Sequence, residues 1–471
     1  MGIIAKNNKK NQSINQNLRD SYVILQTKFV KRQGEYMKFT KMSLVAALLI
    51  GSSAFAIDNV KVSGDAKLYY SASDNKYGED NTVTTDDTLN NSLFKKDGAS
   101  AQVAVSLGLT ADLTKNVSAG TKVTALSTLG LEGQLVNNVW EGTNGTTDSW
   151  MVNELWLAAT VGNTTGKIGR MTLDTPLVFS ETWSIVENTF EAVVVINQDI
   201  PDTTLVGAYV GGANGQTVGA TASVNGTGIA NVVQGTNNET TFDQFYKGAY
   251  AAGIINNSVK PLTVQAWYFD AATDENLGTT PANTLTGVEA FWLQADVQVE
   301  GILAGAQYVD QEFQTALKDI STNAYALMLG YEMKDVATVK VAYSSVDKDH
   351  SAGFNLGATG QSKLYTEAWW NYGYVTQANT DSYTISLESP VNGMFDLGVY
   401  YTDADQDVAN ATGNDMKEFT VTAGKDFGPL NATLAYIYTD AEDQNVNNTT
   451  GKSSDFNTVQ AYLTLNFLSK L

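Results

Sequence analysis

Residues 395–402 read Phe-Asp-Leu-Gly-Val-Tyr-Tyr-Thr, and the odd positions carry only apolar or aromatic side chains. The even positions carry aspartate, glycine, tyrosine and threonine. Ala432, Leu434, Tyr436 and Tyr438 repeat this alternation further along the chain. A period of two residues is that of a β-strand with one apolar and one polar face. Both segments therefore predict strands that separate an apolar environment from a polar one.

The same alternation recurs along the chain and predicts an all-β fold of eighteen antiparallel strands, with sixteen as the alternative count. The expected strands are 59–70, 101–111, 117–125, 150–161, 166–171, 192–197, 203–211, 246–256, 262–270, 287–299, 302–310, 322–333, 337–346, 382–389, 395–402, 416–426, 431–439 and 456–467.

The connections between these segments alternate between short and long. Tight turns are expected at 163–165, 198–202, 257–261, 300–301, 334–336, 390–394 and 427–430, and long loops at 72–99, 128–149, 212–245 and 347–381. All six prolines fall between the predicted strands, as expected of a residue that cannot donate a hydrogen bond to a sheet. Short turns at one rim and long loops at the other are typical of a transmembrane β-barrel of the bacterial outer membrane.

A membrane position requires this sheet to close, because every backbone group in lipid needs a partner within the protein. Strands of ~9–11 residues are long enough to span a bilayer. Side chains fill the interior of barrels of about eight strands, but not of barrels twice that size. The sequence therefore predicts a water-filled channel.

Charged residues at inward positions of the predicted strands are expected to line this channel. They are Lys61, Asp65, Lys67, Glu154, Asp296, Lys340, Glu388, Asp396, Glu418 and Asp426. Acids outnumber bases among them, and rings of Asp and Glu attract cations. A preference for cations is therefore expected.

Composition excludes several other functions. The 471 residues include no cysteine and one histidine, which rules out thiol catalysis, cysteine-bound zinc, iron–sulfur clusters and disulfides. The formal net charge is −21, and an acidic chain repels nucleic-acid phosphates. We therefore expect no enzyme activity, no required cofactor and no nucleic-acid partner.

The first part of the chain is expected to be a targeting segment. Residues 37–56 combine a basic start, a short apolar run and a final Ala54-Phe55-Ala56, which is the pattern of a cleaved secretory signal peptide. Residues 1–36 lie upstream of this self-sufficient signal, as expected if the start of the protein is placed too early. The mature chain, 57–471, would then carry 20 bases and 48 acids, a net charge of −28.

One loop carries a specific motif. Gly166-Lys-Ile-Gly-Arg170 is followed by Met171-Thr-Leu-Asp-Thr-Pro-Leu177 and by Ser180-Glu-Thr-Trp183. This stretch resembles the third loop of the Campylobacter-type major outer membrane proteins and the wider Opr family of porins. The signal peptide, the first strand and Leu364-Tyr-Thr-Glu-Ala-Trp-Trp370 are also similar to that family.

The resemblance implies an eighteen-stranded, homotrimeric diffusion channel of the Gram-negative outer membrane, in which loop three folds inward and narrows the pore. Asp174, Glu181, Glu187 and Glu191 would then supply acids at the constriction, and Arg170 the facing base. Arg170 shares its strand parity with outward-facing Ile168, so it would reach the interior only if the strand kinks or ends there.

Further expectations concern ligands and partners. Asp403, Asp405 and Asp407 alternate in an acidic loop that could attract divalent cations such as calcium, but the EF-hand pattern is missing. Outer-membrane lipid, lipopolysaccharide and permeating cations and small solutes are the expected partners. The strand 456–467 is similar to those that barrel assembly machinery recognises, although Leu471 stands where such chains usually end in an aromatic residue.

Two alternatives remain open. A barrel hydrolase would need His350 as its general base, but this residue lies in a long loop among charges. A surface adhesin built from the long loops is compatible with a pore.

Overall fold

The computed structural model describes residues 58–74, 93–127, 149–182, 185–214, 223–224, 227–228, 242–272, 285–315, 319–357, 361–407, 415–441 and 455–470. The signal segment with its cleavage residues Ala54 and Ala56, and Leu471, lie outside these ranges. The chain divides into two compact units, Met1–Asp58 with Leu113–Lys115, and Asn59–Asp112 with Asn116–Leu471. In the first unit the described residues are Asp58 and 113–115, which lie in or beside strands, and all that follows concerns the second unit.

Strands dominate the described residues, and no helix among them is long and apolar enough to cross a membrane. The strands are β1 (Asp58–Ser73), β2 (Ala99–Thr114), β3 (Val117–Ser127), β4 (Ser149–Val161), β5 (Thr164–Met171), β6 (Phe190–Asn197), β7 (Thr203–Ala213), β8 (Ser223–Val224), β9 (Thr227–Gly228), β10 (Asp243–Asn256), β11 (Leu262–Ala272), β12 (Leu285–Val299), β13 (Ile302–Thr315), β14 (Ile320–Met333), β15 (Ala337–Val346), β16 (Thr380–Val391), β17 (Phe395–Gln406), β18 (Met416–Phe427), β19 (Leu430–Ala441) and β20 (Asp455–Lys470). Two single-turn 3-10 helices, η1 (Lys96–Gly98) and η3 (Tyr374–Thr376), lie in long connections.

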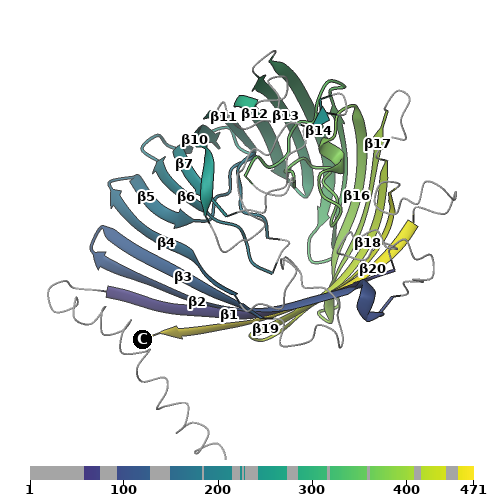
Figure 1. Ribbon diagram of the computed structural model, residues 1–471, viewed down its shortest axis with the longest axis horizontal. Coiled ribbons are helices and arrows are strands. Elements are labelled where there is room, and N and C mark those ends of the chain that lie inside the picture. Colours follow the sequence, from purple (N-terminus) through teal and green to yellow (C-terminus); the bar gives the residue numbers. More distant parts are fainter. Residues whose placement is uncertain are drawn as a thin grey trace, which may run out of the picture. The chain divides into compact units, whose positions relative to one another are not determined.

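Eighteen of these strands form one closed sheet (Figure 1). Each strand pairs with its neighbours in the chain, β7 pairs with β10, and β1 pairs with β20 to close the circle. The short strands β8 and β9 pair only with each other. The prediction of an eighteen-stranded antiparallel barrel is confirmed, and each of the eighteen expected segments overlaps one strand of the wall.

The outer surface of the barrel is apolar. On β14, Tyr325, Leu327 and Leu329 are exposed, whereas Ala324 and Ala326, at the alternate positions, are buried. Apolar exposure at every second position places these side chains on the outer face. Partners across the strands continue this pattern, because residues opposite each other share a face. The wall therefore has an apolar outer face and a more polar inner face.

Tight turns join the strands at one rim, and the connections at the other rim are longer. Glu300 and Gly301 join β12 to β13 with φ of 49° and 84°, the doubly left-handed geometry of a two-residue hairpin turn. One expectation is wrong: Pro390 lies within β16, where it pairs with Asp396 one position before the strand ends. A proline is tolerated there because the hairpin terminates next to it.

Candidate functional site in the barrel interior

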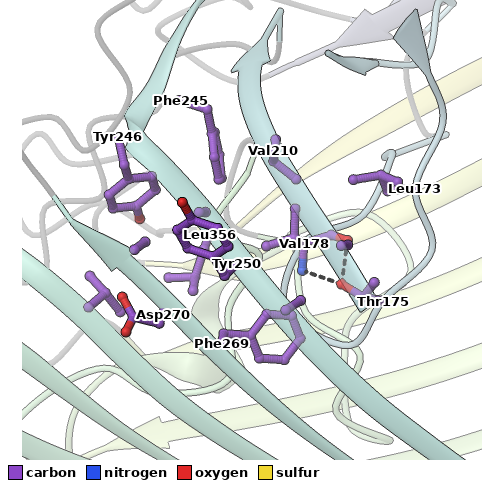
Figure 2. Close-up of a pocket in the computed structure, with 15 residues that line it drawn as sticks. Leu173, Thr175, Val178, Val210, Phe245, Tyr246, Tyr250, Phe269, Asp270 and Leu356 are labelled. Carbon is purple, nitrogen blue, oxygen red and sulfur yellow. Dashed lines mark hydrogen bonds between the residues drawn. The ribbon is translucent and has the colours of Figure 1, made fainter. Parts of the chain in front are cut away.

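Loop three, residues 172–189 between β5 and β6, folds against the inner wall. Thr175 anchors a small hairpin by donating its hydroxyl to the Val178 carbonyl (2.6 Å) and accepting from the Val178 N–H (3.1 Å). Leu177 and Val178 are almost fully buried, in a cluster that includes Phe245 and Phe269 of the wall. Figure 2 shows Val178 beside these two wall residues. Burial of each such side chain stabilises the loop by roughly 1.5–3 kcal/mol. The hairpin is therefore held inside the barrel mainly by apolar contacts.

A second loop enters the interior. Loop seven, residues 347–379 between β15 and β16, packs Ala352, Phe354 and Leu364 into the same cluster. The Tyr365 hydroxyl donates to Asp296 of β12 at 2.5 Å, and the Thr384 hydroxyl of β16 donates to the Thr366 carbonyl at 2.8 Å. The sequence analysis predicted 347–381 as a long loop but did not place it inside the barrel.

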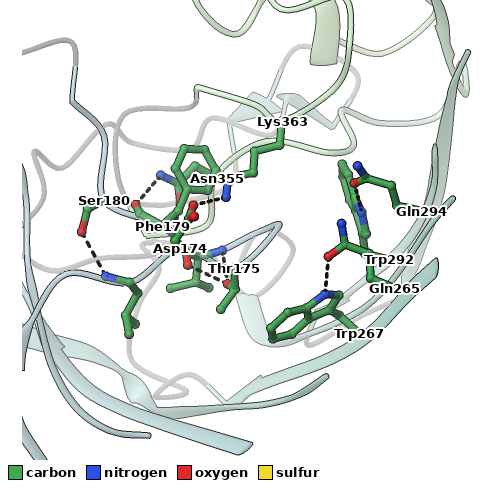
Figure 3. A network of polar contacts seen from close by, with 12 residues as sticks. Asp174, Thr175, Phe179, Ser180, Gln265, Trp267, Trp292, Gln294, Asn355 and Lys363 are labelled. Carbon is green, nitrogen blue, oxygen red and sulfur yellow. Dashed lines mark hydrogen bonds and ion pairs between the residues drawn. The ribbon is translucent and has the colours of Figure 1, made fainter. Parts of the chain in front are cut away.

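Loops three and seven are joined by hydrogen bonds and an ion pair. The Leu356 N–H donates to the Leu177 carbonyl at 2.8 Å. Asn355 donates its amide to the Phe179 carbonyl at 2.9 Å (Figure 3). The same amide also donates to Glu181 at 2.9 Å. Lys363 of loop seven forms an ion pair with Asp174 of loop three and lies 4.8 Å from the centre of the Phe179 ring. The narrowing element is therefore a pair of loops.

The acids expected at the constriction occupy three different environments. Asp174 is exposed and pairs with Lys363. Glu187 pairs with Lys122 of β3 at 2.6 Å, which ties the far end of loop three to a strand that is separated from β5 only by β4. Glu181 is 3% exposed and is enclosed between the loops, where it contacts Asn355.

Arg170 and Glu191 do not belong to the interior, which corrects their expected place at the constriction. Arg170 pairs across the sheet with Leu155, an exposed residue of the outer face, and with Glu191. Their side chains form an ion pair of 2.9 Å, and the Arg170 guanidinium stacks 4.0 Å from the Phe242 ring centre. Gly169 has a φ of 127°, but the pairing on both sides keeps Arg170 on the outer face.

The ten wall residues expected to line the channel all lie at inner-face positions of their strands, as the registers show. Lys61, Asp65 and Lys67 belong to β1, Glu154 to β4, Asp296 to β12, Lys340 to β15, Glu388 to β16, Asp396 to β17, and Glu418 and Asp426 to β18. The Tyr400 hydroxyl donates to Glu388 at 2.9 Å, and the Trp156 indole N–H donates to Glu154 at 3.1 Å.

Glu418 departs from the expected role of a pore-lining acid, because loop seven covers it. Its side chain is 1% exposed. Its oxygens accept hydrogen bonds from the backbone N–H groups of Trp369, Trp370 and Asn371 at 2.7–3.2 Å, and from the Thr420 hydroxyl at 2.8 Å. This carboxylate anchors a loop instead of meeting solutes.

Three lysines of the interior were not predicted from the sequence. Lys122 and Lys167 occupy inner positions, and Lys167 lies 4.3 Å from the centre of the Trp156 ring. The alternation of inward and outward side chains was sufficient to predict both, because the residues directly beside each lysine in its strand face outward. Lys363 lies in a loop, where no periodic signal exists.

His350, the residue required by a barrel hydrolase, is 1% exposed. Its ring lies 6.2 Å from that of Phe313, and its Nδ1 makes no hydrogen bond. Burial lowers the pKa of His350, with the nearby Asp349 acting in the opposite direction. The environment is that of a packed core side chain.

Two of the acidic residues expected to attract divalent cations belong to β17. Asp403 and Asp405 lie at outer-face positions of β17, and the Tyr401 hydroxyl donates to Asp403 at 3.0 Å. Within the described ranges, no group of three or more His, Cys, Asp and Glu side chains is arranged to hold a metal ion.

Comparison with known proteins supports the fold. No protein-family model matches the chain, and no curated protein matches its sequence. Solved structures do match. OpdK of Pseudomonas aeruginosa, crystallised with vanillate, has a TM-score of 0.63 at 13% identity, covering 88% of this chain and 99% of its own. OccK8 (OprE) of the same organism matches with a TM-score of 0.63 at 14% identity and the same coverages.

A third Pseudomonas aeruginosa protein, OccK9 (OpdG), matches with a TM-score of 0.63 at 12% identity, covering 88% of this chain and 99% of its own. Another OpdK structure is described as that of an outer membrane protein. The similarity extends over nearly the whole length of these proteins. At such low identities the likeness establishes the fold.

Proposed function

We propose that the protein is an outer-membrane porin, a water-filled channel for ions and small hydrophilic solutes. One observation carries the proposal: a closed sheet with exposed apolar residues outside and lysines and acids inside. A closed sheet satisfies its backbone hydrogen bonds within lipid, and eighteen strands enclose more space than wall side chains fill. The fold shared with OpdK, a Pseudomonas outer membrane protein, agrees with this location.

The inward position of loops three and seven favours a channel over an adhesin. A loop packed against the inner wall narrows the route of a solute and is not available at the cell surface. In this proposal the ion pairs of Asp174 with Lys363 and of Glu187 with Lys122 border the narrowest part. The kinship of loop three with Campylobacter-type proteins is part of the same proposal, and rests on the motif 166–177.

Charge at the inner face supports a preference for cations. The charged residues that are not buried at inner positions or on loops three and seven include the acids Asp65, Glu154, Asp174, Glu187, Asp296, Glu332, Glu388, Asp396 and Asp426, and the bases Lys61, Lys67, Lys122, Lys167, Lys340 and Lys363. The excess is negative, and a field inside a low-dielectric wall raises the local concentration of cations.

Neutralising two of these acids is expected to weaken the preference. In the double variant Asp65→Asn/Glu154→Gln, the cation-to-anion permeability ratio should decrease by roughly a factor of two or more. The reversal potential across a potassium chloride gradient measures this ratio. Asp199→Asn, a matched change in the exposed turn after β6, should leave it unaltered. If the unmodified protein and both variants gave the same reversal potential, the charges of the inner face would not determine the selectivity.

The outer surface also supports self-association, and we propose that the protein is a homotrimer. Each of the strands β7 and β10–β19 carries an aromatic side chain at an outward position, as in a lipid-facing girdle, for example Tyr209, Tyr308 and Tyr401. On β2, β3, β5 and β6 no outward position is aromatic, and β4 contributes only Trp150. Aromatic girdles mark contact with lipid, so a face without one suits contact with protein.

A second copy of the chain is the expected occupant of this face. Sedimentation of the purified protein in detergent should give three chains per particle. A Leu157→Arg/Val193→Arg variant, charged on that face, should yield single chains that remain folded. Single chains of the unmodified protein would contradict the trimer.

A further inference from the structure

Arg170 and Glu191 form an ion pair on the outer face of the wall, where the proposed channel has no use for it. Arg170 lies in β5, directly opposite Glu191 in β6. The next outward residues of the same two strands, Ile168 and Val193, are apolar and exposed. The ion pair is therefore a polar site within an apolar surface.

The ion pair lies at a depth that corresponds to the middle of a bilayer. Arg170 is six residues from Thr164, where β5 begins after a tight turn, and Glu191 is six residues from Asn197, where β6 ends before the next turn. Six residues of a strand are about 20 Å long. Strands of outer-membrane barrels tilt by ~35–45°, so this length corresponds to a height of roughly 15 Å within an apolar band of ~25 Å.

The ion pair leaves hydrogen-bonding atoms without a partner. Arg170 donates from Nε to Oε1 of Glu191 at 2.9 Å and from Nη1 to the Val152 carbonyl at 3.3 Å. Among the described residues, no hydrogen bond engages Nη2 of Arg170 or Oε2 of Glu191. The two side chains are 32% and 47% exposed, so both remain accessible from outside the barrel.

A protein surface suits this site better than lipid does. Hydrocarbon offers no partner for the remaining N–H groups of a guanidinium, and arginine on the lipid face of a barrel is destabilising near the bilayer midplane. A neighbouring protein can supply hydrogen-bonding groups at the same depth. The strands around the ion pair also lack the outward aromatic side chains of a lipid-facing girdle, as described above. Two separate features therefore indicate contact with protein.

We propose that Arg170 and Glu191 form the polar centre of the contact between two copies of this chain, in which groups of the neighbouring copy hydrogen-bond to Nη2 and Oε2. The inference deepens the proposed homotrimer and rests on it. In a ring of three chains each contact joins two different surfaces, so Arg170 does not oppose its own counterpart. The Phe242 ring, 4.0 Å from the guanidinium, restricts the arginine and reduces the entropy lost on association.

The test compares the assembly of Arg170→Met/Glu191→Met with that of the unmodified protein, by sedimentation in detergent over a range of concentrations. Replacing both residues avoids leaving one charge uncompensated. The concentration at which trimers dissociate should rise roughly tenfold or more, because each contact loses hydrogen bonds to charged groups. Lys425→Met removes a charge from an outward position of β18 and should leave assembly unchanged.

A nitroxide label provides a measurement that keeps the ion pair intact. The chain contains no cysteine, so Ile168→Cys and Leu327→Cys each create a single attachment site. The two side chains are similarly exposed in the single chain, at 56% and 53%. In vesicles, oxygen dissolved in lipid should reach the label at 327 readily, whereas the label at 168 should lose most of this accessibility.

The outcomes separate the contact from the channel. If the double variant assembles like the unmodified protein and resists urea better, the ion pair faces lipid and the inference is wrong. Equal oxygen accessibility at the two labels would contradict it as well, and this result does not depend on the folding of the double variant. Single chains of the unmodified protein would reject both the trimer and this contact, while a current through those single chains would leave the channel proposal intact.

Discussion

Exchange of Lys122 for glutamate is expected to release the far end of loop three and to replace the steady current by a larger, fluctuating one. Lys122 and Glu187 are 2.6 Å apart, and each is only about one-fifth exposed. A hydrogen bond between charged groups contributes roughly 1.5–3 kcal/mol, and the substitution turns this attraction into repulsion. The Leu177 hairpin should remain in place, since its anchor is apolar.

The exchanged pair supplies the control. Lys122→Glu/Glu187→Lys has the composition of the unmodified chain at these sites and should recover the steady current. Lys67→Glu makes the same charge change at another inner position and should alter selectivity without the fluctuations. If the current of the double variant fluctuates as much as that of Lys122→Glu, the contact between these two residues does not hold the loop.

Arginine at Leu327 is expected to reduce the stability of the folded barrel strongly. Leu327 is 53% exposed and stands between Tyr325 and Leu329 on the outer face, near the middle of β14. Arginine or lysine at the bilayer midplane of a β-barrel costs about 2–4 kcal/mol. Urea titration of the refolded protein in phospholipid vesicles, followed by heat-modifiable migration on a gel, measures this loss.

Val336 offers a matched position for comparison. It is also exposed, at 59%, but it lies in the turn between β14 and β15, where water is accessible. Val336→Arg should therefore cost no more than about 1 kcal/mol. Equal losses at Leu327 and Val336 would be inconsistent with lipid contact at the outer face of β14.

Periodicity was sufficient to predict the wall because lipid and water impose opposite requirements on alternate residues. The signal is repeated in every strand, so single exceptions do not obscure it. Pro390 is such an exception, because a strand end beside a tight turn does not need every donor. The parity of Arg170 also indicated the outer face correctly, whereas the resemblance to known loops assigned it to the constriction.

The interior of the barrel was less predictable, because it depends on contacts between distant segments. Leu356 is hydrogen-bonded to Leu177, and Asn355 to Glu181, although more than 170 residues separate the partners in the sequence. Nothing in the spacing near Glu418 distinguishes a carboxylate facing water from one covered by loop seven. The alternation of side chains along the strands was sufficient to predict the inward position of Lys122 and Lys167, but not the residues that they contact.

If ions cross a membrane through this barrel, the purified protein in a planar bilayer carries a single-channel current that can be recorded. We expect discrete, stable steps of current, in groups of three for a trimer, with a reversal potential that favours cations in a potassium chloride gradient. A folded, heat-modifiable barrel that inserts into the bilayer and carries no current would contradict it.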